Sequence, residues 1–296
     1  MRLAARAASA LLLTGVTLAA AGCGPVDQAG VQGPSQVSAA PAKNAITAIL
    51  NAGVEADLGA GEGRVKFLFD PLYDNHFGSL AEMDDALAEA IISGAAPYDR
   101  VDAVFVSHAH GDHFSAQYLN QMMAAQPGLT VIAPKQAADA MRTHALWQEG
   151  FAARLTAVEL ENGAPAQRLS IAGAEVEAIR TPHAGWPERH SQTHNLTYRI
   201  SVDDPATGTR RVMHMGDADP DPAHFAPYES FFAEARSGVA IVPFWFLRAQ
   251  DNDPLFNQTL NVQQPVGVHV PVLTPQWVEG RTIFTRPGQQ ITVPAS

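Results

Sequence analysis

Cysteine, basic residues and long apolar runs are all scarce in this sequence of 296 residues. Cys23 is the only cysteine, so the chain can form no internal disulfide. The 19 Lys and Arg face 30 Asp and Glu, which argues against a nucleic-acid partner because phosphates are bound mainly by basic side chains. Beyond the N-terminus no apolar run reaches the ~18 residues that a membrane-spanning helix needs. The remaining composition is that of a globular protein with a sizeable core.

Residues 1–22 resemble the signal peptide of a bacterial lipoprotein. Arg2 and Arg6 give a positive start, an apolar stretch follows, and small residues precede Cys23. The resemblance predicts cleavage before Cys23 and attachment of a lipid to Cys23. The protein would then be exported and anchored to a bacterial membrane, facing the periplasm or the cell exterior. An ordinary secretory signal with an unrelated cysteine is the alternative. Removal of the leader leaves 17 basic against 30 acidic residues, a net charge of −13.

Residues 23–42 predict a flexible tether, and residues 43–296 predict a single domain. The tether contains Gly, Pro, Gln, Ser and Ala with almost no large apolar side chains, so it buries too little surface to order itself. No second stretch of this kind follows, and no repeat of 20 to 50 residues is visible.

Extended and helical patterns alternate through the predicted domain. Strands are expected at 45–50, 65–69, 101–106, 129–133, 155–160, 167–171, 174–180, 195–202, 210–215, 239–243 and 266–270. Helices are expected at 80–92, 115–125, 135–144 and 222–235. Each half is a run of strands covered by helices, which predicts the α/β (α+β) class with two sheets packed face to face and helices outside.

One loop concentrates groups that bind metal. His108, His110, Asp112 and His113 directly follow the apolar strand 101–106, and Gly111 would give the turn its backbone freedom. Imidazole and carboxylate are ligands that Zn²⁺ prefers. The alternative is a solvated histidine-rich loop, but the preceding buried strand and the spacing of the aspartate favour a metal site.

This pattern of His-x-His-x-Asp-His after a buried strand resembles the signature of the metallo-β-lactamase fold superfamily. The resemblance extends from about residue 43 to the C-terminus and implies a four-layer αββα sandwich of two mixed β-sheets flanked by helices. It also implies two metal ions. His108 and His110 would bind the first metal, and Asp112 and His113 would bind the second.

The resemblance places the third ligand of the first metal at the end of strand 174–180. His183 follows that strand after Pro182 and is the expected ligand. His190 and His194 lie within a dozen residues and remain competitors, although His194 leads into the next strand.

The remaining site residues are expected at the ends of other strands. Asp217 resembles the family's bridging aspartate, with a turn or helix-capping residue as the alternative, and His269 would complete the second metal unless it is a core or surface histidine. Asp70 occupies the place of an aspartate that orients a metal-binding histidine, although Asp70-Pro71 could equally be a turn. His214 lies inside a strand and is expected to pack rather than bind metal.

The predicted chemistry is hydrolysis by a metal-bound hydroxide that attacks an ester, a lactone or a phosphodiester. Two divalent ions are expected, with Zn²⁺ preferred, and Asp112 or Asp217 would move a proton. A bridging Asp217 argues against β-lactam hydrolysis, and His110 in place of a glutamate argues against the redox-active diiron branch. Two alternatives remain: a non-catalytic metal-binding lipoprotein and a mononuclear iron oxygenase of the same fold.

Segments 67–71 and 241–246 loosely resemble lactonase-like and phospholipase-like members of the superfamily. The expected substrate is a small molecule or is derived from a lipid. Phe244, Trp245 and Phe246 follow a strand and either line an apolar pocket near the metals or belong to the core.

Overall fold

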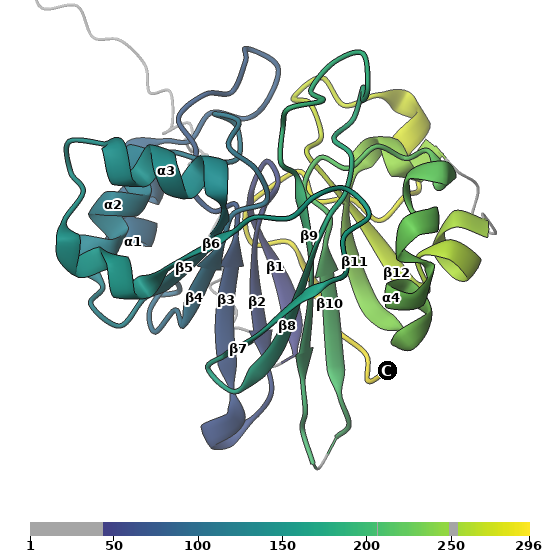
Figure 1. Cartoon of the computed structure of the whole chain (residues 1–296), viewed down its shortest axis with the longest axis horizontal. Coiled ribbons are helices and arrows are strands. Elements are labelled where there is room, and N and C mark those ends of the chain that lie inside the picture. Colours follow the sequence, from purple (N-terminus) through teal and green to yellow (C-terminus); the bar gives the residue numbers. More distant parts are fainter. Residues whose placement is uncertain (1–43, 206, 249–253) are drawn as a thin grey trace, which may run out of the picture. The chain divides into compact units, whose positions relative to one another are not determined.

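The computed structural model describes residues 44–205, 207–248 and 254–296, which form two β-sheets packed face to face between helices (Figure 1). The predicted signal peptide, Cys23 and the tether lie outside the described residues. In the part of the chain that the structure covers, no helix has the length and apolar character needed to cross a membrane.

The seven-stranded sheet has the order β13-β1-β2-β3-β4-β5-β6 and is antiparallel from β13 to β3 and parallel from β3 to β6. Its strands are β1 Ala45–Leu50, β2 Gly53–Leu58, β3 Val65–Phe69, β4 Ala103–Phe105, β5 Thr130–Pro134, β6 Leu155–Val158 and β13 Gln290–Thr292. The six-stranded sheet has the order β12-β11-β10-β9-β8-β7 and is parallel only from β12 to β10. Its strands are β7 Gln167–Ile171, β8 Ala174–Arg180, β9 Leu196–Val202, β10 Arg210–His214, β11 Ser237–Pro243 and β12 Val262–Val268.

Helices cover the outer face of each sheet, which confirms the four-layer αββα sandwich (Figure 1). Helices α1 Asp85–Ser93, α2 Ala116–Ala125 and α3 Lys135–Thr143 pack on the seven-stranded sheet, and α4 Glu229–Glu234 packs on the other. The Ser115 side chain accepts a hydrogen bond from the Tyr118 amide and caps α2.

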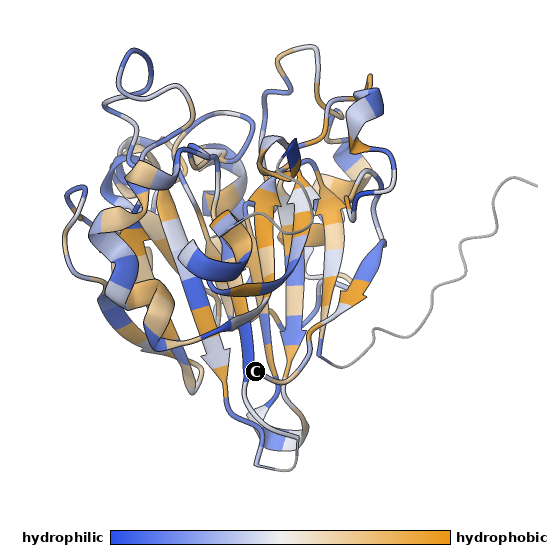
Figure 2. Ribbon diagram, turned by 90° about the vertical axis from the view of Figure 1, so that its right-hand side faces the viewer, coloured by the Kyte–Doolittle hydropathy of each residue, from blue (hydrophilic) through white to orange (hydrophobic). Residues whose placement is uncertain are grey.

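Apolar side chains from both sheets fill the space between them. Phe105 of β4 stacks on Phe69 of β3 at 5.1 Å and meets Tyr198 of β9 edge to face at 5.2 Å. Apolar residues run along the strands, whereas the covering helices alternate between apolar and hydrophilic residues (Figure 2). The core therefore lies mainly between the sheets, with a smaller apolar layer under each set of helices.

Three expectations for individual elements are wrong. The helix expected at 222–235 is interrupted by Pro227 and consists of two 3₁₀ turns followed by the short α4, because proline lacks the amide that a helix interior needs. Strands β2 and β13 were not expected. Strand β12 ends at Val268, so His269 lies just beyond it, with a left-handed φ of 61°.

Candidate metal centre

The loop that follows β4 is held in place by both sheets. The Leu196 amide of β9 donates to the Ser107 carbonyl at 2.8 Å, and the Tyr198 hydroxyl donates to the Val106 carbonyl at 2.9 Å. These bonds fix the start of the histidine-rich segment where the two sheets meet. The loop thus begins from a rigid base, which suits a site that must hold several ligands in register.

Gly111 serves this loop in a different way from the one expected. It does not adopt a positive φ, but a Cβ at this position would lie only 3.0 Å from the Asn75 Cβ. The amides of Asp74 and Asn75 both donate to the Gly111 carbonyl, at 3.1 and 2.9 Å. Glycine therefore gives the room that a larger residue would have to gain by displacing Asn75, because the segment after β3 lies directly against the loop.

Three of the expected ligands come together as one group, called here the histidine group: His108, His110 and His183. The Nε2 of His108 lies 3.1 Å from the Nδ1 of His110, and the His183 ring lies 4.9 and 4.7 Å from the other two. Burial lowers the pKa of all three imidazoles, that of His183 to about 4. The three rings are neutral near pH 7, which is the form that binds metal.

The other four form a second group, called here the mixed group: Asp112, His113, Asp217 and His269. The His269 Nε2 lies 3.0 Å from Asp112 Oδ2 and 3.5 Å from Asp217 Oδ2. Burial raises the pKa of both aspartates, but the neighbouring histidines outweigh it, so that the pKa of Asp112 is lowered and that of Asp217 lies well below its usual range. Both carboxylates are therefore ionised.

Burial alone would lower the pKa of His113, yet the carboxylates of Asp217 and Asp70 raise this pKa well above its usual value. The local field at His113 thus strongly favours a positive charge. A divalent cation bound by the mixed group would supply such a charge.

Asp217 lies between the two groups. Its Oδ1 is 3.3 Å from the His113 Nε2 of the mixed group, and its Oδ2 is 3.7 Å from the His183 Nε2 of the histidine group. Oδ2 also lies 3.5 Å from the His269 Nε2, so Oδ1 faces the mixed group alone and Oδ2 lies between the two groups. The Asp217 carboxylate therefore lies near nitrogens of both groups.

Three buried atoms at the centre make no hydrogen bond with the described residues: His113 Nε2, His183 Nε2 and Asp217 Oδ1. Leaving a buried polar atom unpaired costs about 1–3 kcal/mol. Metal coordination would satisfy all three atoms, and nitrogen and carboxylate oxygen are the donors that Zn²⁺ and similar ions accept. The residues present therefore fit two metal ions.

Asp70 lies behind both groups. It accepts hydrogen bonds from the Ser107 amide at 2.7 Å, from the Ser107 hydroxyl at 2.6 Å and from the His113 Nδ1 at 2.8 Å. The Ser107 hydroxyl also lies 3.0 Å from the His108 Nδ1. Asp70 thus orients His113 directly and His108 through Ser107, in the manner of a carboxylate that supports metal-bound imidazoles.

The other histidines near the centre differ in their surroundings. His190 is exposed, and its ring lies 5.0 Å from His110 and 4.5 Å from His183, outside the histidine group. The His194 amide donates to the Gln136 side chain. His214 is buried and stacks on Phe69 at 5.0 Å, as expected for a packed histidine.

Two asparagines that the sequence did not single out support the mixed group. Asn51, in the turn between β1 and β2, donates from Nδ2 to the Asp112 carbonyl at 2.8 Å and accepts from the His269 amide at 3.2 Å. Asn195 accepts from the Asp217 amide at 3.0 Å. Asn51 has a φ of 52°, a left-handed conformation that asparagine tolerates, but only the fold reveals its partners.

The glycine before Asp217 is required for two reasons. Gly216 has a φ of 53°, and a Cβ there would lie 2.3 Å from the Asn195 Oδ1 and 2.6 Å from the Ser107 Cβ. No other residue fits without moving these groups. The Gly-Asp pair therefore brings the Asp217 backbone against the loop that carries the first ligands.

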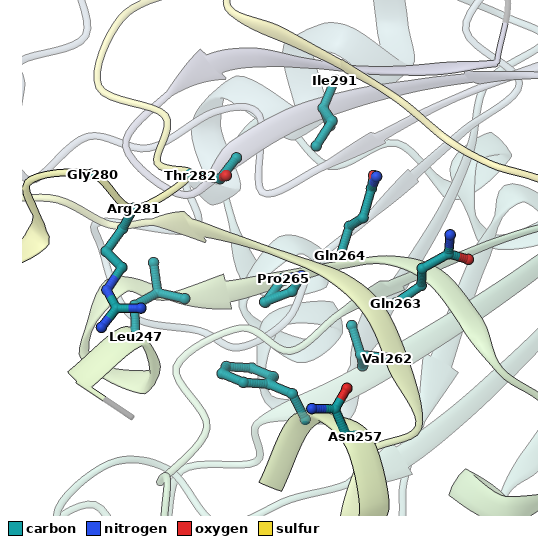
Figure 3. Close-up of a pocket in the computed structure, with 11 residues that line it drawn as sticks. Leu247, Asn257, Val262, Gln263, Gln264, Pro265, Gly280, Arg281, Thr282 and Ile291 are labelled. Atoms are coloured by element: carbon teal, nitrogen blue, oxygen red, sulfur yellow. The ribbon is translucent and has the colours of Figure 1, made fainter. Parts of the chain in front are cut away.

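A cavity of about 310 Å³ lies elsewhere, between β12 and residues 280–282 (Figure 3). Its lining includes Gln263, Gln264 and Asn257 and none of the seven candidate ligands. The polar amides seen in Figure 3 are therefore separate from the metal centre.

Comparisons with known proteins agree with this geometry. The family model described as a beta-lactamase superfamily domain matches residues 66–253. A solved structure of a "possible metal-dependent hydrolase" from Veillonella parvula is 15% identical, with a TM-score of 0.55 over 85% of this chain and 100% of that chain. Isothiocyanate hydrolase from Delia radicum gut bacteria is 16% identical, with a TM-score of 0.51 over the same shares.

No curated protein matches the sequence. At these identities the two structures show the fold alone, whereas the family model covers more than half of the chain. Together with the His and Asp cluster able to bind metal ions, the match shows that the chain belongs to the beta-lactamase superfamily and has the fold of its metal-dependent hydrolases.

Proposed function

We propose that the chain is a binuclear metal-dependent hydrolase of esters, lactones or phosphodiesters. The observation that carries this proposal is the position of Asp217, whose carboxylate faces ligand nitrogens of both groups. A carboxylate shared by the two groups would help to hold one divalent ion in each, as two-metal hydrolases require. Zn²⁺ is the ion that this donor set favours.

Each group would hold one ion, and the two bound ions would activate water and polarise the oxygen of the scissile bond. Asp70 keeps the rings of His108 and His113 oriented. Water is otherwise largely excluded, since only His110 and His269 among the seven ligands are more than slightly exposed.

We assign proton transfer to Asp112 rather than Asp217. Asp112 directs Oδ2 to His269, and in the described chain its Oδ1 meets no hydrogen-bond donor. Both oxygens of Asp217 face ligand nitrogens. A free carboxylate oxygen beside the reacting centre can accept the proton of water and return it to the leaving group.

The test is metal analysis together with hydrolysis of a chromogenic ester, a lactone and a phosphodiester by the loaded protein. We expect about two ions per chain. Loss of a supporting residue near a metal typically costs 10–100-fold, so Asp217→Ala, which removes a shared ligand, should lower kcat/KM by more than about 100-fold. Asp221→Ala, which removes an exposed aspartate four residues away, should leave hydrolysis unchanged.

Two outcomes would contradict the proposal. Full metal occupancy with no turnover across the panel would indicate a metal-binding protein that is not a hydrolase. One iron per chain would indicate a mononuclear oxygenase of the same fold.

We further propose that Cys23 carries a lipid that holds the protein at the exported face of a bacterial membrane. The support is the sequence of residues 1–23 alone. Substitution Cys23→Ser should release the protein from the membrane fraction. Unchanged membrane association would refute the anchor.

A further inference from the structure

Three aromatic side chains lie in a chain of ring contacts that begins at a ligand of the mixed group. The Trp245 ring meets His269 edge to face at 5.4 Å, and the Phe244 ring meets Trp245 at 5.5 Å. Trp277 then stacks on Phe244 at 5.6 Å, with 21° between the ring planes. We call Phe244, Trp245 and Trp277 the aromatic wall.

The wall is fixed in position by polar contacts at both ends. The Trp245 indole N–H donates to the Ala218 carbonyl at 3.1 Å, directly beside Asp217. At the other end the Arg248 guanidinium lies 5.1 Å from the centre of the Trp277 ring. Aromatic rings held at both ends lose little further freedom when they bind a ligand.

The wall differs from the aromatic residues of the core in its exposure. Phe244, Trp245 and Trp277 are all half-buried. Phe246, which the sequence grouped with the first two, is 1% exposed and packs against Phe225 at 6.2 Å. Of the two expected placements, Phe246 therefore takes the core, whereas Phe244 and Trp245 are half-buried and Trp245 lies against the candidate ligand His269.

We propose that the aromatic wall binds an aromatic ring of the substrate while the metals hold its ester, lactone or phosphodiester group. This inference rests on the proposed hydrolase function and names its substrate class as aryl-bearing. The wall begins at His269, so a ring against it lies beside the bond to be cleaved. Half-exposed aromatic side chains next to a few convergent polar groups are typical of a small-molecule site, and ring pairs favour edge-to-face and offset contacts such as those the wall already makes.

Phenylphosphonate and methylphosphonate test the proposal, since they present the same anion to the metals and differ in the ring. Titration calorimetry of the metal-loaded protein should show about tenfold tighter binding of phenylphosphonate, in line with the size of aromatic contacts. Phe244→Leu, which touches no ligand residue, should reduce this preference to about threefold or less, and so should Trp245→Leu.

The matched control is Trp147→Leu, which removes a half-buried tryptophan that contacts Phe151 in the layer under the helices. This variant should keep the tenfold preference. Equal affinity of the wild type for both phosphonates, no binding of either, or an unchanged preference in Phe244→Leu would overturn the proposal.

Hydrolysis of methyl and phenyl p-nitrophenyl phosphate separates this proposal from the hydrolase proposal. A phosphonate preference without turnover of these diesters, of the ester or of the lactone would leave the aromatic wall standing and refute the hydrolase. Turnover of both diesters at the same kcat/KM, with equal affinities for the two phosphonates, would support the hydrolase and refute the aromatic wall.

Discussion

The histidine group and the mixed group are neighbours that share Asp217, yet their chemistry differs. The histidine group is three imidazoles that burial keeps neutral, whereas the mixed group contains two ionised carboxylates and the strongly basic His113. The first group thus offers neutral donors and the second offers negative charge. Without metal, the second group is the one that most needs a cation.

The two groups also differ in their supports. His110 Nε2 lies 3.3 Å from the Thr193 hydroxyl, and His183 Nδ1 lies 3.0 Å from the Ala184 carbonyl, so these two histidines have neutral partners that the mixed group does not share. The mixed group relies on Asn51, Asn195 and Asp70, which lie far away in the sequence. We therefore expect a substitution that removes the support of one group to lower the affinity for one metal and to leave the affinity for the other unchanged.

Asp70→Asn should have the largest effect, because Asp70 supports both groups. The amide would present N–H to the His113 Nδ1 and lose an acceptor for the Ser107 hydroxyl. Each stepwise metal affinity, measured by competition with a chromogenic chelator, should fall by about 10–100-fold. Asp102→Asn, at an aspartate that accepts from the Lys66 amide, is the control, and loss of only one affinity would show that Asp70 does not serve both groups.

Asn51→Gly should weaken one metal only. Glycine keeps the left-handed φ but removes the bond from Nδ2 to the Asp112 carbonyl, so the mixed group loses one of its supports while the histidine group keeps all of its contacts. One stepwise affinity should fall by about tenfold.

Asn44→Gly is the matched control for Asn51→Gly. Asn44 also has a left-handed φ, of 57°, but it precedes β1, and its side chain accepts from the Gly59 amide, away from both groups. Equal losses at both metals in Asn51→Gly would contradict the separation of the two groups.

Thr193→Val should weaken the other metal by a smaller factor. The valine is similar in shape but cannot bond to the His110 Nε2, and the loss of one neutral hydrogen bond predicts a change of about threefold. The affected step should be the one that Asn51→Gly spares. Thr209→Val, at a half-buried threonine whose hydroxyl donates to Asp203 away from both groups, should change neither step.

Glu55→Gln should leave both metal affinities unchanged and alter only stability. Burial raises the pKa of Glu55 to about 7, with Lys66 at 3.9 Å opposing the shift, in contrast to the lowered pKa values of the site aspartates. Stability from protonated Glu55 is present below about pH 4.5 and is lost as the pH rises through 7.

The free energy of unfolding of Glu55→Gln should therefore exceed that of the wild type by about 1–3 kcal/mol at pH 8. At pH 5 the two free energies should differ little. Denaturant unfolding at the two pH values measures this difference. Glu62→Gln, at an exposed residue, should behave as the wild type at both, and a Glu55→Gln variant less stable at pH 8 would show that the Lys66 pair outweighs burial.

The sequence predicted many of the strands whose residues are apolar and β-branched, and it singled out the histidines and aspartates that gather in the two groups beyond them. Strand β8 and strand β3 match the expected bounds. Strand β2 was not predicted because Glu55 and Asp57 give its sequence a polar character. These two carboxylates can be buried because Lys66 and Arg64 form ion pairs with them, which the sequence does not reveal.

The residues that hold the candidate ligands in place could not be predicted from the sequence, because their partners are distant along the chain. Asn51 and Asp112 are 61 residues apart, and Asp70 and Ser107 are 37 apart, so their bonds depend on how the sheets meet. The histidine-rich motif can be recognised in the sequence because its residues lie close together along the chain. The residues that support it can be recognised only in the folded structure.

Each ligand group takes residues from both sheets: the loop after β4 on one side, and His183, Asp217 and His269 after strands of the other. Two bound ions would therefore join the sheets at one end of the sandwich, and part of the binding free energy would become cohesion between the two halves of the fold. A chelator would then do more than stop catalysis. It would loosen this end of the molecule and lower the cooperativity with which the sheets separate on unfolding.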